Sequence, residues 1–406
     1  MKKEFIPVFR FVICSDAHIE GIGTPGYNRL KEVIDYSLGF AAEAEGHKGI
    51  DALFVAGDIT NRGTKAEFDA FGEIYNYGTK KGLKILCTVA KGHDSITMGK
   101  KSLGYFKSIT NQETDFHREI GGYHFIGLST CNTDKKYYSF SQKLWLKKQL
   151  KWAAEQSADK PVFVFHHEHV KNTVYGSSDF DGWGNRFFGG VFEKYPNVVD
   201  FSGHSHYPVN DPRSVWQREF TAFGTGSLKY VELTVDDDRK VHPDFYDSCA
   251  NFLIVELDKN SNMRVFGIDA MEEEILCEYY LKNPADKSNR EYTLEKQRSR
   301  AAAPCFAQNA EPDVDKSNGD IYVATYPEAE CADKTPVFIY RVYVENEKGE
   351  TVKSEKTIPS DYYLSGKNEE IRTCIGMLDK GRYKLKILAE NVYGMKSEYI
   401  EKTIEI

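Results

Sequence analysis

Histidine and carboxylate side chains gather in five short clusters within the first 206 residues. In chain order these are Ser15-Asp16-Ala17-His18, Gly57-Asp58, Gly92-His93-Asp94, His166-His167-Glu168-His169 and Gly203-His204-Ser205-His206. None of the clusters contains a cysteine. Imidazole nitrogens combined with carboxylate oxygens, without thiolates, suit divalent Zn, Mn, Fe or similar ions. The clusters therefore predict a metal site, provided that the fold brings them together.

The secondary structure expected around the clusters indicates how the fold would bring them together. Apolar, β-branched runs predict strands at Phe9–Cys14, Ala52–Ala56, Leu83–Val89, Tyr123–Ser129, Val162–His166 and Val198–Ser202. Three stretches between them, residues 28–45, 65–81 and 141–156, have the apolar spacing of helices. This alternation is typical of layered βα units, in which ligands gather at the carboxyl ends of the strands. Each cluster follows one of the expected strands.

The ordered clusters resemble the motifs of the calcineurin-like metallophosphoesterase superfamily: D-x-H, G-D-x-x, G-N-H-D/E, a lone His after a strand, and G-H-x-H. The resemblance covers roughly residues 8 to 280. It implies an α/β fold with two packed sheets flanked by helices. It also implies two divalent metal ions and these site residues: Asp16, His18 and His206 on one ion, His166 and His204 on the other, Asp58 bridging both, and His93 over the substrate phosphate.

The chemistry that the resemblance implies is phosphoester hydrolysis without a covalent intermediate. Two ions about 3.5–4 Å apart polarise phosphoryl oxygens and lower the pKa of a shared water toward about 7, which supplies hydroxide for in-line attack. His93 would stabilise charge or protonate the leaving oxygen.

One motif departs from the family pattern. Gly92 stands where the family has an Asn ligand, and Lys91 stands where it has the preceding Gly. The second ion would therefore lose an oxygen ligand and bind more weakly, unless water, the substrate or Asp94 fills the place. Lys91 either brings positive charge toward an anionic substrate or is an ordinary solvated side chain.

Other residues near the motifs have weaker assignments. Arg62 resembles the phosphate-contacting Arg of protein phosphatases, but Asn61 replaces their Asp, and an exposed turn Arg explains it equally well. His167 is a candidate second-shell donor, and His169 is expected at the surface. Residues 179–188, which include Trp183, either wall the pocket or pack as an ordinary loop.

Composition limits the class of protein. With 406 residues, 41% of them hydrophobic, the chain can form two or three folded domains. Its net charge of −8 argues against nucleic-acid binding, and no apolar run is long enough to span a membrane. Eight cysteines without a C-x-x-C pair, and no signal peptide, predict a cytoplasmic protein unless a leader was removed.

The last hundred residues have the spacing of a β sandwich. The segments Leu378–Tyr383 and Ala389–Gly394 resemble the end of a fibronectin type III domain, although a sandwich of another family is also possible. We therefore expect a catalytic domain at 1–283, a linker at 284–303 and a fibronectin type III-like sandwich at 304–406.

Together the patterns predict a metal-dependent phosphoester hydrolase, either a phosphomonoesterase or a phosphodiesterase. The alternative is a degenerate phosphoesterase fold retained as a binding or scaffold module. Retention of the six ligand positions and His93 favours the enzyme. The expected partner is a phosphoester substrate, whose identity, like that of the metal, the sequence leaves open.

Overall fold

The chain folds into two compact units. The computed structural model describes residues 5–130, 138–178, 182–236, 239–317, 320–353, 355–366 and 370–406. One unit comprises Met1–Leu233 and Phe245–Leu294, and the other comprises Thr234–Asp244 and Glu295–Ile406. No helix in these ranges is both long and apolar enough to cross a membrane.

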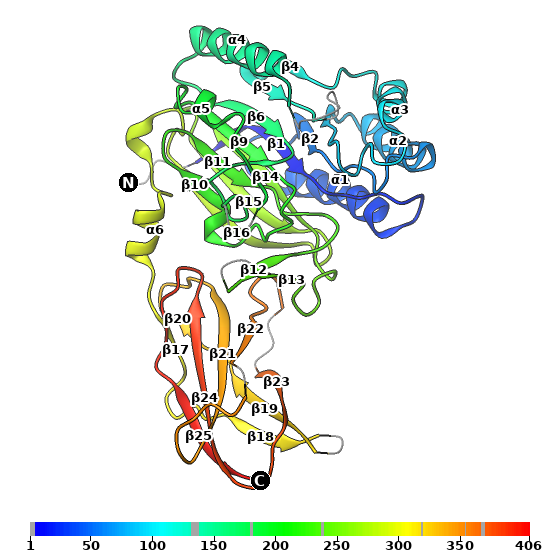
Figure 1. Ribbon diagram of the computed structural model, residues 1–406. Helices are drawn as coiled ribbons and strands as arrows, with labels where there is room; N and C mark the ends of the chain where they lie inside the picture. Colours follow the sequence, from blue (N-terminus) through cyan, green and yellow to red (C-terminus); the bar gives the residue numbers. More distant parts are fainter. Residues whose placement is uncertain are drawn as a thin grey trace. The chain divides into compact units, whose positions relative to one another are not determined.

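Two six-stranded sheets form the centre of the first unit (Figure 1). The first sheet has the order β16 (Glu274–Leu281), β15 (Met263–Asp269), β14 (Asn251–Asp258), β1 (Pro7–Cys14), β2 (Ala52–Ala56) and β3 (Ile85–Thr88). The second has the order β10 (Val215–Gln217), β11 (Thr221–Gly224), β9 (Val198–Ser202), β6 (Val162–His166), β5 (Tyr123–Gly127) and β4 (Phe116–Ile120). Neighbours among β1, β2 and β3, and among β11, β9, β6 and β5, run parallel, so each sheet has a parallel half whose carboxyl ends can carry a site.

Phenylalanine rings fill the space between the two sheets. Phe54 of β2 stacks on Phe165 of β6 with ring centroids 4.1 Å apart, and Phe11 of β1 meets Phe163 of β6 at 4.9 Å. All four side chains are buried in one core cluster. Because side chains alternate along a strand, the neighbouring residues of each strand face the other way, toward the helices.

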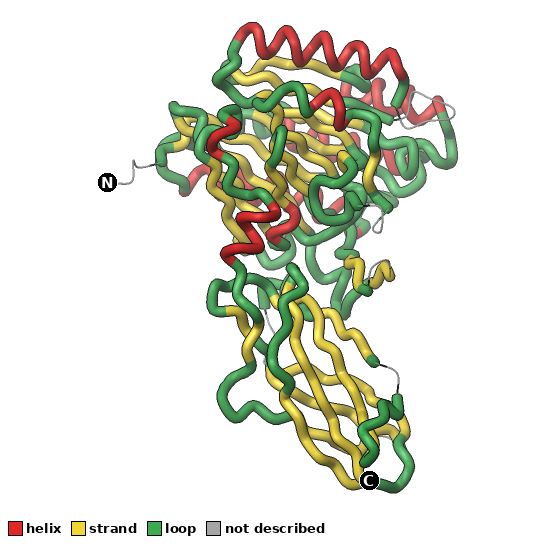
Figure 2. Tube along the Cα trace, turned by 60° about the vertical axis from the view of Figure 1, so that its left-hand side comes forward, coloured by secondary structure: helices red, strands yellow, loops and turns green. Residues whose placement is uncertain are grey.

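Helices cover the outer faces of both sheets (Figures 1 and 2). The first sheet packs on α1 (Pro25–Glu43), α2 (Lys65–Lys80) and α3 (Lys100–Thr110). The second packs on α4 (Phe140–Gln156) and the short α5 (Gly189–Phe192). The predicted architecture, two packed sheets between helices, is confirmed. The sequence patterns did not predict α3 or β4.

Capping boxes explain where two of these helices begin. The backbone N–H of Glu67 donates to the Thr64 hydroxyl, and the Glu67 carboxylate accepts from the backbone N–H of Thr64, at the start of α2. Ser139 and Gln142 make the same exchange at the start of α4. Each box satisfies two N–H groups that a helix start would otherwise leave without partners.

The second unit is an all-β sandwich, as predicted. Its three-stranded sheet has the order β18 (Asp313–Lys316), β19 (Ile321–Pro327) and β23 (Glu370–Met377). Its four-stranded sheet has the order β22 (Lys356–Pro359), β21 (Val337–Asn346), β24 (Arg382–Asn391) and β25 (Ile400–Glu405). The Tyr383 hydroxyl donates to the Asp379 carbonyl at 3.1 Å, the bond of a tyrosine corner.

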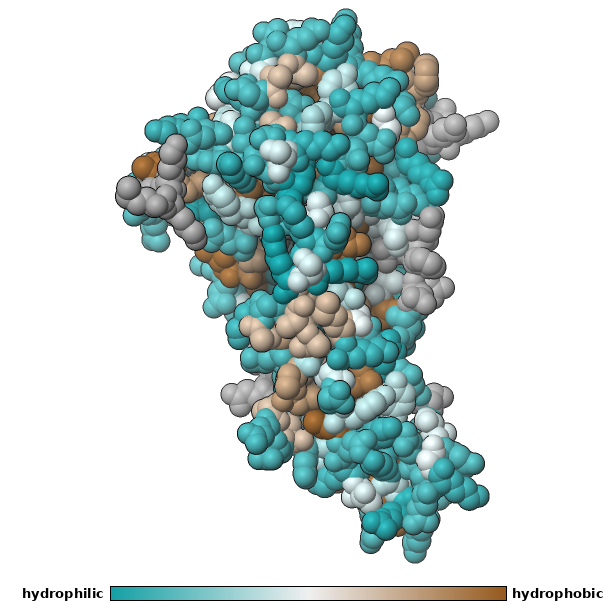
Figure 3. Space-filling model, turned by 90° about the vertical axis from the view of Figure 1, so that its left-hand side faces the viewer, coloured by the Kyte–Doolittle hydropathy of each residue, from teal (hydrophilic) through white to brown (hydrophobic). Residues whose placement is uncertain are grey.

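The remaining described elements are short. They are β7 (His169–Val170) paired with β8 (Gly184–Asn185), β12 (Leu233–Val235) paired with β13 (Arg239–Val241), β17 (Pro304–Cys305) paired with β20 (Glu330–Cys331), the 3-10 turns Pro212–Ser214 and Lys287–Asn289, and α6 (Leu294–Arg300). Figure 3 shows one face of the molecule, where hydrophilic residues predominate and apolar ones lie in scattered patches, as is usual for a folded protein in water.

Candidate metal centre

Loops that follow five parallel strands bring the predicted clusters together. From the first sheet, β1 leads to Asp16 and His18, β2 leads to Asp58, and β3 leads to the loop of His93. From the second sheet, β6 and β9 lead to the other histidines. The contacts between these side chains place the ends of both parallel sheet halves beside one another.

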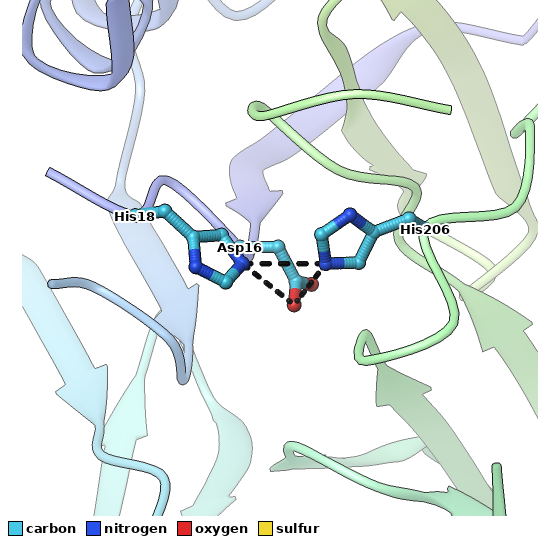
Figure 4. Close-up of side chains that lie close together, drawn as sticks. All are labelled: Asp16, His18 and His206. Atoms are coloured by element: carbon cyan, nitrogen blue, oxygen red, sulfur yellow. Dashed lines mark hydrogen bonds and ion pairs between the residues drawn. The ribbon is translucent and has the colours of Figure 1, made fainter. Parts of the chain in front are cut away.

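The first group consists of Asp16, His18 and His206, all buried (Figure 4). The Nε2 atom of His206 lies 3.1 Å from Asp16 Oδ1 and 3.3 Å from His18 Nε2. His18 Nε2 lies 3.9 Å from the same carboxylate oxygen. One ligand atom from each residue lies within 4.8 Å of the others, which is close enough for all three to reach one ion.

The second group consists of Asp58, His167 and His204. The Nε2 atom of His167 lies 3.1 Å from Asp58 Oδ2 and 3.1 Å from His204 Nδ1. His18 Nε2 lies 4.0 Å from Asp58 Oδ2 and so links this group to the first. Asp58 therefore occupies the middle of the cluster, where a bridging ligand would lie.

Two buried carboxylate oxygens indicate that this cluster suits cations. Asp16 Oδ1 and Asp58 Oδ1 accept no hydrogen bond from the described residues. An unsatisfied buried carboxylate oxygen is costly, and a divalent ion would compensate it. The possible ligand atoms in the cluster are imidazole nitrogens and carboxylate oxygens, which suit divalent transition-metal ions.

The structure brings His167, and not the predicted His166, beside Asp58 and His204. His166 belongs to the face of β6 that carries Val164, which packs under the helices, whereas His167 continues the face of Phe165 toward the other sheet. The strand alternation therefore turns His166 away from the cluster. Its Nε2 lies 2.7 Å from Asp200 Oδ1, in a buried position.

Second-shell contacts fix the orientation of the ligands. The His167 Nδ1 donates to the Ala56 carbonyl at 3.0 Å, which leaves Nε2 for the carboxylates. His206 Nδ1 lies 3.2 Å from the Ser227 hydroxyl. The predicted surface position of His169 is wrong: it is buried, and its two ring nitrogens lie 2.8 Å and 2.7 Å from the hydroxyls of Ser202 and Ser205.

Two glycines permit this close packing. A Cβ atom at Gly57 would lie 2.9 Å or less from atoms of the His167 side chain, and one at Gly203 would lie 2.4 Å from Asp16 Oδ2. Larger residues would therefore push the ligands apart. The glycine of each G-D and G-H motif is needed for space at the site.

Five of the proposed ligands have left-handed backbone conformations. Their φ angles are 55° at Asp16, 45° at His18, 48° at Asp58, 73° at His204 and 60° at His206. Non-glycine residues adopt this region at a cost of roughly 1 kcal/mol or more each. The fold accepts this cost where it directs side chains into the cluster.

Electrostatic interactions affect the histidines of the cluster in opposite directions. Burial, together with neighbouring imidazolium charge, lowers the pKa of His18 and of His204 to about 3, so both rings are neutral. Burial opposes charge on His167, but the carboxylates of Asp58 and Asp16 outweigh it and raise the pKa of His167 well above its usual value. His167 thus carries a positive charge between two carboxylates in the absence of a metal ion.

A family model of calcineurin-like phosphoesterases matches residues 9–208. These residues belong to that family. The resemblance seen in the ordered motifs is thereby confirmed. The family implies divalent metal ions, and the clusters of His and Asp side chains could bind them.

Solved structures give weaker likenesses. The chain is similar to purple acid phosphatase PPD1 from yellow lupin (Lupinus luteus) seeds, with 12% identity over 67% of this chain and 53% of that one and a TM-score of 0.48. It thus spans about half of that phosphatase. The sandwich region is similar to the fibronectin type-III domain of human fibronectin type III domain containing protein 3, with 18% identity over 25% of this chain and 86% of that one and a TM-score of 0.15. No curated protein matches the sequence.

His93 lies beside the first group of the phosphoesterase site. Its ring centroid lies 4.3 Å from that of His18, and its Nδ1 donates to the Asn61 carbonyl at 2.8 Å. A ligand atom of His93 also lies within 4.8 Å of His18 and Asp58 ligand atoms. The distances therefore allow His93 either to contact a substrate or to bind an ion.

Asp94 does not replace the Asn ligand that the family has at the position of Gly92. Both carboxylate oxygens of Asp94 are occupied, one by the backbone N–H and hydroxyl of Thr60 and the other by the Ala90 N–H. A Cβ atom added at Gly92 would meet only Asp58 Oδ1, at 4.0 Å. An Asn side chain would therefore fit there and extend beside the bridging carboxylate.

The remaining predicted residues lie at the edge of the site. Arg62 is exposed on the turn before α2, and Lys91 is half-buried beside Gly92. Their contact with substrate stays a prediction. Of the segment 179–188, residues 179–181 lie outside the described residues, whereas Trp183 packs edge-on against His204 with ring centroids 4.8 Å apart. The sequence singled out this Trp but not Tyr230, which contacts His206.

Substituting the two adjacent histidines separates their roles. His167→Ala should remove one metal equivalent, because it deletes a ligand of the second group. His166→Ala should retain both ions but lower the free energy of unfolding by about 3–5 kcal/mol, because Asp200 would stay buried without its partner. Elemental analysis and urea denaturation measure the two effects. Loss of metal from His166→Ala alone would contradict the assignment.

Backbone strain at His204 predicts that a glycine variant at this position is more stable than an alanine variant, the reverse of the usual order. At φ 73°, His204→Gly should be more stable than His204→Ala by about 1 kcal/mol in the metal-free protein, because glycine adopts this conformation without steric cost. The same pair of substitutions at His93, which is not among the positive-φ residues, should show the ordinary order with Ala more stable. Urea denaturation of the four variants tests this expectation, and the same order at both positions would refute it.

Proposed function

We propose that the first unit hydrolyses phosphoesters with two divalent metal ions. Asp16, His18 and His206 would hold one ion, His167 and His204 would hold the other, and Asp58 would bridge them. The observation that supports this most directly is that Asp16 and Asp58 each have one buried carboxylate oxygen, Oδ1, without a hydrogen bond among the described residues, and that both carboxylates lie 3.1 Å from an imidazole nitrogen.

When bound, the two ions supply Lewis-acid polarisation of the phosphoryl oxygens and lower the pKa of water toward neutrality. In the reaction, a water oxygen forms a bond to phosphorus, the bond from phosphorus to the ester oxygen breaks, and the alcohol leaves with a proton. Asp58, which lies between His18 and His167, would fix the two groups of ligands relative to one another.

His93 would serve the leaving oxygen. The Asn61 carbonyl holds Nδ1–H, so the ring presents Nε2 on its other side. Protonation of Nε2 gives an imidazolium that can donate to the departing alcohol oxygen, and the proton released by the attacking water restores it through solvent. The neighbouring His18 ring limits rotation of His93.

The rival function, a degenerate phosphoesterase retained as a binding module, rests on Gly92 in place of the family's Asn. It predicts no hydrolysis at any metal concentration. Metal-loaded protein should instead release nitrophenol from p-nitrophenyl phosphate or from bis-p-nitrophenyl phosphate. Failure with both esters in protein that binds metal would favour the binding module.

Removal of the proposed general acid should slow turnover without releasing metal. His93→Ala should lower kcat by roughly 10²–10⁴-fold, the usual scale for general acid catalysis, with metal content unchanged. Parallel loss of one metal equivalent and of activity would instead identify His93 as a ligand, which its distances to His18 and Asp58 permit.

Restoring the family's Asn should tighten the weaker ion. Gly92→Asn adds an amide oxygen beside Asp58 and should lower the Kd of the second Mn²⁺ about tenfold or more in calorimetric titration. Gly92→Ala is the matched control, because it adds a Cβ without a ligand and should leave this Kd unchanged. Two equally tight ions in the unmodified protein, with no effect of Gly92→Asn, would mean that another group already supplies the ligand.

A further inference from the structure

Two aromatic side chains contact the two histidines of the G-H-S-H turn. Trp183 meets the ring of His204 edge-on, with centroids 4.8 Å apart. Tyr230 lies against the ring of His206, with centroids 4.3 Å apart and an interplanar angle of 47°. Both side chains are half-buried and come from separate segments, one just before β8 and one between β11 and β12. Neither belongs to the motifs of the metal centre.

A third ring extends this group. Tyr246 lies edge-on to Tyr230 with centroids 6.0 Å apart, and the backbone N–H of Val231 donates to the Tyr246 carbonyl at 2.7 Å. Tyr230 and Tyr246 therefore form an aromatic pair beside His206, and Trp183 lies beside His204 of the same turn.

A carboxylate lies against the same rings. The Trp183 indole N–H donates to Glu232 Oε1 at 3.3 Å, and the Glu232 backbone N–H donates to the His206 carbonyl at 3.0 Å. The lysine of this segment, Lys229, is directed to Glu20, with Nζ and Oε1 2.5 Å apart.

The segment that carries Tyr230 and Glu232 is firmly anchored. The buried guanidinium of Arg29 on α1 donates to the carbonyls of Leu228, at 2.9 Å, and of Lys229. The hydroxyl of Ser227 accepts from the Lys229 N–H at 2.9 Å. The backbone that carries Tyr230 and Glu232 is therefore held in place before any ligand arrives, which lowers the entropic cost of binding.

Aromatic faces and a carboxylate attract the same kind of ligand. The negative faces of Trp and Tyr rings bind ammonium groups, with about 0.5–2 kcal/mol for each contact. A carboxylate beside a phosphate site repels further anionic groups and attracts a cation. An uncharged apolar leaving group would gain nothing from Glu232.

We propose that Trp183, Tyr230 and Glu232 bind a positively charged ammonium group on the alcohol of the substrate. The preferred substrates are then phosphoesters of amino alcohols, in particular those with a quaternary nitrogen. This inference rests on the proposed phosphoester hydrolysis and adds the class of alcohol to it.

Two esters of the same shape test this specificity. Phosphocholine and 3,3-dimethylbutyl phosphate differ only in that a neutral carbon replaces the charged nitrogen. With Mn²⁺-loaded protein and inorganic phosphate as the readout, kcat/KM should be about tenfold or more higher for phosphocholine, which corresponds to about 1.4 kcal/mol.

Substitutions test whether these three side chains cause the preference for phosphocholine over 3,3-dimethylbutyl phosphate. Glu232→Gln keeps an acceptor for the Trp183 indole but removes the charge, and it should lower the ratio of the two kcat/KM values severalfold. Trp183→Leu and Tyr230→Leu should lower the ratio as well. Glu193→Gln, at an exposed carboxylate after α5, is the matched control and should leave the ratio unchanged.

A binding measurement separates this proposal from the proposed function. Choline, but not 3,3-dimethylbutanol, should change the tryptophan fluorescence of the full chain, and Trp183→Leu should abolish the change. If neither ester is hydrolysed, the proposed function fails, and the choline titration alone decides on the ammonium site. Equal kcat/KM values for the two esters, or choline binding that Trp183→Leu and Glu232→Gln leave intact, would overturn the proposal.

Discussion

Two carboxylates buried beside the same imidazole are the constraint on which the first unit depends. The Nε2 atom of His167 lies 3.1 Å from Asp58 and 3.8 Å from Asp16, and each carboxylate has one oxygen without a hydrogen bond among the described residues. In a low-dielectric interior such charges are tolerated only when opposite charge compensates them. The left-handed backbone at five ligands and the glycines that admit them all serve this one arrangement.

The arrangement requires both sheets. Asp16, His18 and Asp58 follow strands of the first sheet, whereas His167, His204 and His206 follow strands of the second. The distance between the side chains from the two sheets is therefore set by the phenylalanine layer between the sheets. In this layer Phe54, from the strand that leads to Asp58, stacks on Phe165, from the strand that leads to His167. A change of volume in that layer would reach the ligands, because packed interiors transmit strain.

Much of this could be predicted from the sequence. The strands β2, β6 and β9 begin and end at the expected residues, because each is a short, mainly apolar run bounded by polar residues, Gly or Pro. The choice between His166 and His167 depended on strand phase: Phe163 and Phe165 mark the inner face, and His167 continues it, a signal present in the sequence. The contacts of Trp183 and Tyr230 were not predictable, because loops of irregular backbone bring them to the histidines, and no periodicity describes such loops.

The division of the chain between the two units has a consequence for the sandwich. Residues 234–244 belong to the second unit although they lie within the sequence of the first, and Arg341 pairs with Asp236 at 3.2 Å inside that unit. The chain therefore crosses between the units three times, after residues 233, 244 and 294. The second unit is consequently not one contiguous stretch of the chain: a cut before residue 295 would separate it from residues 234–244, although the strands of its two sandwich sheets all lie between residues 313 and 405.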